Sequence, residues 1–263
     1  NTVTKMDKKC IKEPRAFDFF LAPSKLAALR FNYCVDAPKL KYILCGQPRN
    51  DQLLAESSSN LDNYNLSKFN KLILYAPTWR AYGPTRWFPF DDMDIDSLNE
   101  MLIDNNSVLL LRPHRTEKGT VSEYVRSNIQ MFDAEICPDI NTVLKEIAIM
   151  ITDYSSIIVD YFLCDRPFLF FHQDYERYHQ HYNFMTVNPD FWFPGRKPKT
   201  YKGFLKDLSQ EIKGEDIYRQ QRIIVNALLN AYQDKNSSKK IYELIVSGRL
   251  IEAKKNITRE IVA

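Results

Sequence analysis

Glycine is scarce in this chain, with 7 glycines among 263 residues. The closest pair, Gly195 and Gly203, fits neither the Gly-x-Gly-x-x-Gly spacing of dinucleotide-binding proteins nor the spacing of a P-loop. The sequence therefore argues against a glycine-rich phosphate loop of either kind.

The five cysteines form no Cys-x-x-Cys pair, and their number is odd. Such a set is typical of unpaired thiols in a reducing compartment rather than of a disulfide framework. The histidines His172, His179 and His181 match no standard zinc spacing. We therefore expect no bound metal and no other cofactor.

Strong charge and long apolar runs are also lacking. The net charge is +3, from 36 basic and 33 acidic residues, which gives no support for a nucleic-acid partner. No apolar run approaches the ~20 residues that a membrane-spanning helix requires. The basic residues of the C-terminal part are typical of a solvated helix face; the alternative is a weak attraction to an anionic membrane surface.

What the sequence does contain is a regular alternation of short apolar runs and helical patterns. Strands are predicted at residues 16–22, 41–45, 72–75, 108–111, 129–137, 147–151 and 168–171. Helices are predicted after Ser24, from a capping box of Thr120 and Glu123, and at residues 139–146, 157–164, 203–213, 216–232 and 237–246. The alternation between residues 71 and 171 predicts an α/β fold with an open parallel sheet.

Polar side chains follow three of these strands at the points where the strands end. In open α/β sheets, ligands bind outside the carboxyl ends of the strands, so these side chains are expected to meet at one site. Guanidinium groups and a helix start with hydroxyls suit phosphate, and an imidazole can donate to phosphate or transfer a proton. The candidates are Thr78, Arg80, Arg112, His114, Thr152, Ser155 and Ser156.

Several of these residues also have an ordinary structural interpretation. Ser155 and Ser156 are typical helix caps, a role that is compatible with phosphate binding. Arg80 and Arg112 have possible partners in the aspartates of residues 91–94. An acid at Asp153 would repel a phosphate, so it is interpreted as a residue that orients a loop.

Four motifs taken together resemble the CDP-glycerol glycerophosphotransferase family, whose members build teichoic acids and related capsule polymers. The motifs are Gly46-Gln47-Pro48-Arg49-Asn50-Asp51, Tyr75-Ala76-Pro77-Thr78-Trp79-Arg80, Arg112-Pro113-His114 and Thr152-Asp153-Tyr154-Ser155-Ser156. Asp160, Asp165-Arg166-Pro167 and Pro194-Gly195 extend the resemblance, which covers residues from about 16 to 245.

This resemblance implies a GT-B fold, in which two Rossmann-like domains face each other across a cleft. Residues 67–245 would form the nucleotide-donor-binding domain, residues 1–66 the end of the acceptor-side domain with the crossover, and residues 246–263 a polar tail. The implied donor phosphate and nucleotide ligands are Thr78, Arg80, Arg112, Thr152, Ser155, Ser156, Asp160 and Arg166, with His114 as the catalytic residue; Asp160 has the alternative of pairing with Arg166. The implied crossover and cleft residues are Gly46, Pro48, Arg49, Asn50 and Asp51, the last three with a structural turn as the alternative.

The resemblance also implies an activity: transfer of glycerol phosphate, or a similar polyol phosphate, from CDP-glycerol or CDP-ribitol to a lipid-linked polymer, with release of CMP. Such an enzyme would be cytoplasmic and peripheral on the cell membrane. The family's Trp-His-Gly-Thr motif, whose His is the implied base, does not occur in this sequence, and His114 is its first histidine. The chain, which starts at Asn1, is therefore expected to bind the donor without a complete acceptor site. A nucleotide-sugar glycosyltransferase of the same fold and a non-catalytic binding module remain open as alternatives.

Overall fold

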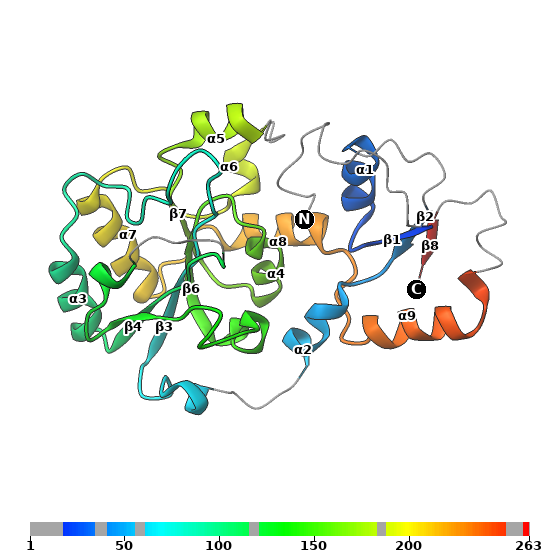
Figure 1. The fold of residues 1–263 in the computed structure, drawn as a ribbon, viewed down its shortest axis with the longest axis horizontal. Coiled ribbons are helices and arrows are strands. Elements are labelled where there is room, and N and C mark those ends of the chain that lie inside the picture. The colour runs from blue at the N-terminus through cyan, green and yellow to red at the C-terminus, as the bar shows by residue number, and fades with distance from the viewer. Residues whose placement is uncertain are drawn as a thin grey trace. The chain divides into compact units, whose positions relative to one another are not determined.

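The computed structural model describes residues 18–34, 41–55, 61–115, 121–182, 188–250 and 260–262. The chain divides into two compact units, each with its own parallel sheet (Figure 1). Unit 1 contains residues 1–57, 176–187 and 223–263, and unit 2 contains residues 58–175 and 188–222.

Unit 2 is built on a five-stranded parallel sheet with the strand order β5-β4-β3-β6-β7. Its strands are β3 (Lys71–Tyr75), β4 (Ser107–Leu111), β5 (Ile129–Met131), β6 (Ile147–Thr152) and β7 (Phe168–Phe170). Tyr75 is in register with Leu111 on one side and Ile151 on the other, so the three central strands end at the same level. Their apolar sequences are almost wholly buried, as expected for strands covered on both faces.

The helices of unit 2 precede, connect and follow its strands. They are α3 (Ile95–Asp104), α4 (Ile157–Tyr161), α6 (Pro189–Trp192) and α7 (Tyr201–Ile212), with the short 3₁₀ helices η2 (Leu61–Tyr64), η3 (Ser122–Tyr124), η4 (Ile140–Thr142), η5 (Leu144–Glu146) and η6 (Phe162–Cys164). Leu98 of α3 and Phe204 of α7 belong to the same apolar core as the sheet residues Ile73 and Ile151. This core fixes the sheet from which the polar loops project.

Unit 1 has a three-stranded parallel sheet of β1 (Phe19–Ala22), β2 (Lys41–Leu44) and β8 (Glu260–Val262), with β2 in the middle. Its other elements are α1 (Lys25–Cys34), η1 (Pro48–Asn50), α2 (Asp51–Leu54) and α9 (Ser237–Val246). Two further helices, α5 (Tyr175–Tyr182) and α8 (Arg219–Leu229), contain residues of both units.

The predicted crossover residues lie beside the start of α9. The two carboxylate oxygens of Asp51 accept hydrogen bonds from the backbone N–H groups of Ser237 and Ser238, at 3.0 and 2.7 Å. A Cβ atom added at Gly46 would collide with the Ser237 hydroxyl. Asp51 therefore satisfies free N–H groups of the first turn of α9 and has a structural role within unit 1.

The predicted fold class, α/β with a parallel sheet, is confirmed, and several local predictions are wrong. Residues 139–146 form two 3₁₀ turns instead of one helix, and the strand predicted at 129–137 is three residues long. Thr120 of the predicted capping box lies outside the described residues, and only η3 follows it. Segments this short have little intrinsic helical stability, so tertiary contacts decide their form.

Several elements were not predicted, among them α3, α5 and β8. Helix α3 begins at Ile95, and Asp94 caps it by accepting from the backbone N–H groups of Asp96 and Ser97. Residues 260–262 of the predicted polar tail form β8, whose partner strand β2 lies more than two hundred residues earlier in the chain. The functional ranges 1–66, 67–245 and 246–263 stay a prediction.

Replacing Asp51 by Ala is expected to destabilise α9. The change removes a charged acceptor from two N–H groups and should cost about 1–2 kcal/mol of local stability. Hydrogen–deuterium exchange of residues 237–246 measures this as a loss of protection of about tenfold. The exposed Asp104, at the end of α3, supplies the control: Asp104→Ala should leave exchange in α9 unchanged, and equal exchange in the two variants would contradict the capping role.

Candidate functional site

A cavity of about 260 Å³ opens at the carboxyl ends of the strands of unit 2. Ala76 and Pro77 line it after β3, and Ala134 lines it after β5. Residues 112–115 contribute after β4, and Ser155 and Ile157 contribute at the start of α4. The cavity thus lies at the edge of the sheet where the sequence places a ligand.

The cavity lining combines apolar residues with two arginines, one histidine and one serine. Arg112 is held in place because its Nη1 donates to the carbonyl oxygens of Phe132 and Asp133, both at 3.0 Å. Burial lowers the pKa of Arg112, but a guanidinium remains charged at neutral pH. His114 and Arg115 follow it and are exposed. Two guanidinium groups and an imidazole around a small cavity suit an anion with several oxygens.

Ser155 and Ser156 precede α4, and neither side chain caps it. Ser156 occupies the cap position, but its side chain forms no capping hydrogen bond. Within the described part of the chain, the two serines accept hydrogen bonds from α4 only through their backbone carbonyl oxygens. The interpretation of these hydroxyls as helix caps is therefore wrong. The hydroxyl of Ser155, at the cavity wall, can meet a ligand without giving up a protein partner.

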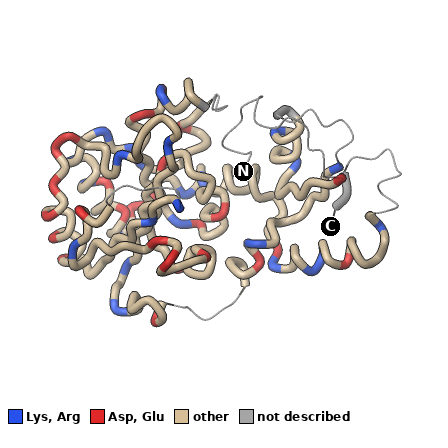
Figure 2. Tube along the Cα trace, viewed as in Figure 1, with Lys and Arg blue, Asp and Glu red and all other residues tan. Residues whose placement is uncertain are grey.

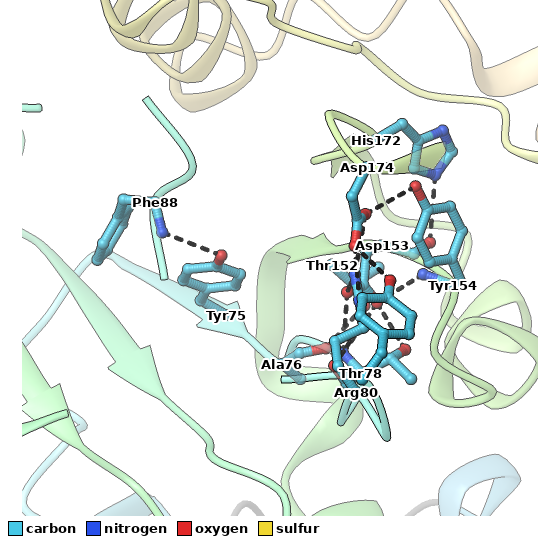
Figure 3. Close-up of polar contacts among 11 residues, drawn as sticks. Tyr75, Ala76, Thr78, Arg80, Phe88, Thr152, Asp153, Tyr154, His172 and Asp174 are labelled. Atoms are coloured by element: carbon cyan, nitrogen blue, oxygen red, sulfur yellow. Dashed lines mark hydrogen bonds and ion pairs between the residues drawn. The ribbon is translucent and has the colours of Figure 1, made fainter. Parts of the chain in front are cut away.

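Next to the cavity, Asp153 is the centre of a buried polar network (Figure 3). Its carboxylate accepts from the backbone N–H of Thr78 at 2.9 and 3.0 Å and from the Thr78 hydroxyl at 2.6 Å. It also accepts from the N–H of Tyr154 at 2.5 Å and forms an ion pair with Arg80 at 2.8 Å. Asp153 therefore links the loop after β3 to the loop after β6.

Arg80 continues the network to a second carboxylate, Asp174. Its Nε and Nη2 donate to Asp174 at 2.8 and 3.2 Å, and its Nη1 donates to the carbonyl of Thr78 at 2.5 Å. The hydroxyls of Tyr82 and Tyr154 also donate to Asp174, at 2.7 and 3.2 Å. Burial alone would raise the pKa of Asp174, but these hydrogen bonds and the charge of Arg80 outweigh it and hold that pKa below its usual value.

The structure thus separates the predicted ligand residues into groups. Arg112, His114 and Ser155 line the cavity. Thr78 and Arg80 are engaged by Asp153, and the hydroxyl of Thr152 donates to the Ala76 carbonyl at 2.7 Å. Arg80 forms ion pairs with Asp153 and Asp174, and Asp91 forms an ion pair with Arg86.

The remaining predicted residues lie away from the cavity lining. Asp160 is buried on α4. Arg166 is exposed and precedes β7, which places it at the amino ends of the parallel strands, the edge opposite the cavity. Gly46, Pro48, Arg49, Asn50 and Asp51 belong to unit 1. A ligand role for these residues stays a prediction.

Sequence reasoning missed Asp174 and did not list Arg115 among the site residues. Arg115 directly follows His114 in the polar segment after the strand at 108–111, and the structure places it in the cavity lining. Asp174 lies four residues beyond β7, and the rule of polar residues after a strand would have drawn attention to it. Among the described residues, no group of three or more His, Cys, Asp and Glu side chains is placed to hold a metal ion.

His172 contacts two residues of this network, Asp153 and Tyr154. Its Nε2 donates to the Asp153 carbonyl at 3.3 Å, and its ring stacks on Tyr154 and meets Phe193 edge-on, each with a centroid separation of 4.8 Å. Burial among these rings lowers the pKa of His172 to about 4. The residue is therefore a neutral donor at physiological pH.

Comparisons with known proteins point to one family. The family model of CDP-Glycerol:Poly(glycerophosphate) glycerophosphotransferase matches residues 1–247. A teichoic acid glycerol-phosphate transferase of Staphylococcus aureus is 24% identical over 243 residues, covering 89% of this chain and 61% of the relative. A teichoic acid poly(glycerol phosphate) polymerase of Bacillus spizizenii is 29% identical over 187 residues, covering 67% of this chain and 46% of the relative. The chain thus spans less than two thirds of the length of these curated relatives.

Solved structures give the same picture of the fold. The wall teichoic acid polymerase TagF aligns with 97% of this chain and 67% of its own, with a TM-score of 0.74 and 23% identity. A UDP-N-acetylglucosamine 2-epimerase from Listeria monocytogenes aligns with 94% of this chain and 62% of its own, with a TM-score of 0.55 and 15% identity. These likenesses confirm the predicted fold class.

The depressed pKa of His172 predicts a pH dependence of stability. Between pH 6.5 and about 4, unfolded chains bind a proton at this residue and folded chains do not, so stability is full above pH 6.5 and falls as the pH drops through this range. The loss should reach at most about 3 kcal/mol. Denaturation at pH 7 and pH 4.5 should show this contribution in the wild type and not in His172→Phe. An NMR titration in which His172 protonates near pH 6.5 would contradict it.

Proposed function

The chain belongs to the CDP-glycerol:poly(glycerophosphate) glycerophosphotransferase family. On this basis we propose that it transfers glycerol phosphate, or a similar polyol phosphate, from a CDP-activated donor. The acceptor is a hydroxyl of a growing teichoic acid or capsule polymer. CMP is the second product. The observation that carries the proposal is the cavity at the strand ends, with Arg112, His114, Arg115 and Ser155 in its walls.

The reaction is a displacement at phosphorus. An acceptor hydroxyl oxygen bonds to the β-phosphorus of CDP-glycerol, the bond from that phosphorus to the bridging oxygen breaks, and CMP leaves with the electron pair. Negative charge therefore grows on the leaving phosphate, and fixed cationic donors stabilise it. Arg112 suits this task because two backbone carbonyls already hold its guanidinium in position.

In this proposal, His114 donates a hydrogen bond to the diphosphate of the donor and thereby eases the departure of CMP. It is exposed at the cavity and lies between the two arginines of the same loop, so it can approach a bound phosphate. The family motif implied to carry the base for the acceptor hydroxyl does not occur in these 263 residues, and we assign that proton to no residue of the cavity.

We place the protein on the cytoplasmic face of the cell membrane, where a lipid-linked polymer would be its acceptor. None of the helices that the structure describes has the length and apolar character needed to cross a bilayer. Support comes from α9, on which Tyr242, Ile245 and Val246 are each about 60% exposed. Lys239 on the same helix is exposed as well. Figure 2 shows basic positions along α9 in blue. Exposed apolar residues beside basic ones favour attachment to an anionic bilayer surface.

The central test is the exchange of His114 for Ala. Transfer measured as CMP release from CDP-glycerol with a lipid-linked acceptor should fall at least about a hundredfold, because one proton donor to the phosphates is lost. Circular dichroism should be unchanged, since the side chain is exposed.

Near-normal turnover in His114→Ala would remove this residue from the mechanism. Calorimetric titration with CDP-glycerol, a UDP-sugar and CMP-sialic acid separates the proposed donor from that of a nucleotide-sugar glycosyltransferase. Tight binding of the UDP-sugar alone would replace the proposed function.

Membrane attachment is tested by co-sedimentation with vesicles of phosphatidylglycerol. Ile245→Asp places a charge on the exposed face of α9 and should reduce the bound fraction several-fold. Ile103→Asp is the matched control, because Ile103 is a similarly exposed isoleucine on α3. Equal binding by both variants would exclude α9 as the attachment surface.

A further inference from the structure

Asp153 is a buried carboxylate at the edge of the proposed site that takes no part in its lining. Its side chain is 4% exposed, and it directly follows β6. Hydrogen bonds or an ion pair join both of its oxygens to protein groups, so neither is turned toward a ligand. A carboxylate so completely engaged acts through its partners.

Those partners adjoin two of the segments that line the cavity, and these segments follow the neighbouring strands β3 and β6. Thr78 follows Ala76 and Pro77, which line the cavity after β3. Tyr154 precedes Ser155, which lines it at the start of α4. Adjacent Cα atoms are only about 3.8 Å apart, so anchoring Thr78 and Tyr154 on one carboxylate restrains Pro77 and Ser155 as well.

A second carboxylate, Asp174, also connects these loops. Arg80 spans Asp153 and Asp174, and Asp174 also accepts from the hydroxyl of Tyr154 (Figure 3). The loop after β7 is thereby attached to the loops after β3 and β6. Three loops from neighbouring strands share one network of charged hydrogen bonds.

The positive charge of Arg80 also offsets the repulsion that the Asp153 carboxylate would exert on a nearby phosphate. Burial alone would lower the pKa of Arg80, but the two carboxylates outweigh it and raise that pKa, so the guanidinium stays charged. It neutralises Asp153 at 2.8 Å. A buried acid can therefore lie next to an anion site as long as this pair is intact.

We propose that Asp153 is a positioning residue that sets the separation between the Pro77 wall and the Ser155 wall, and so fixes the diphosphate of the donor. It acts through the hydroxyl and N–H of Thr78, through the N–H of Tyr154 and through Arg80. The proposal rests on the proposed function and deepens it. It assigns Thr78 and Arg80, two predicted phosphate ligands, to support of the cavity rather than to contact with the donor.

Thr78 offers a matched pair of variants to test this. Thr78→Val keeps the shape of the side chain and removes the hydroxyl that donates to Asp153 at 2.6 Å, while Thr78→Ser keeps the hydroxyl and removes a methyl group. Calorimetry of the chain with CDP should show an affinity loss of about tenfold or more for Thr78→Val. Thr78→Ser should bind within about twofold of the wild type.

The affinities are measured well below the unfolding temperature of every variant. A residue that served only stability would shift the unfolding temperature in both variants and leave the affinity for CDP unchanged; that result would overturn the inference. Asp174→Asn is the second variant, for the case in which Thr78→Val does not fold. This change weakens the ion pair between Arg80 and the half-buried Asp174 and should weaken CDP binding several-fold. Wild-type affinity in this variant would also count against the proposal.

Inorganic pyrophosphate is titrated in parallel to separate this inference from the proposed function. Binding of pyrophosphate without CDP binding by the wild type would contradict the proposed donor, and the Thr78 pair would still test positioning on pyrophosphate. Binding of CDP by the wild type, with equal affinity in Thr78→Val and Thr78→Ser, would overturn the positioning role alone. No binding of either probe would overturn both.

Discussion

The parallel register of β3, β4 and β6 is the constraint on which the rest of unit 2 depends. Because Tyr75, Leu111 and Ile151 lie at one level, the three following loops leave the sheet at the same edge. Residues more than seventy positions apart in the chain then become neighbours. The cavity, its cationic lining and the network around Asp153 are all consequences of that register.

The site uses its charged groups in two different ways. Arg112, His114 and Arg115 face a cavity, where an anionic ligand can complete their electrostatic environment. Arg80 has its partners within the protein, in Asp153 and Asp174, and its guanidinium holds loops together. Burial distinguishes Arg80 from His114 and Arg115, since a charge removed from water needs a permanent partner, whereas an exposed group is solvated until a ligand binds. Arg112 is intermediate: it is partly buried, and two backbone carbonyls hold its guanidinium at the cavity.

The same distinction explains the outcome for the serines and for Thr78. All three hydroxyls follow strands and looked equivalent in the sequence. Thr78 is buried and engaged by Asp153, whereas Ser155 is partly exposed at the cavity wall. Polar residues after strands therefore define a region of the fold, and accessibility decides which of them meet a ligand.

The central strands of unit 2 could be predicted from the sequence alone, and so could the polar segments after them that bring Arg112, His114 and Ser155 to the cavity lining, because apolar periodicity and the residues after each strand are local properties. Three outcomes follow from the folded arrangement instead: Arg80 pairs with Asp153, Arg166 lies at the opposite edge, and residues 260–262 join the sheet of β2. These outcomes depend on which strands become neighbours. Hydrogen bonds and ion pairs between distant residues form after that choice, and no local pattern encodes them.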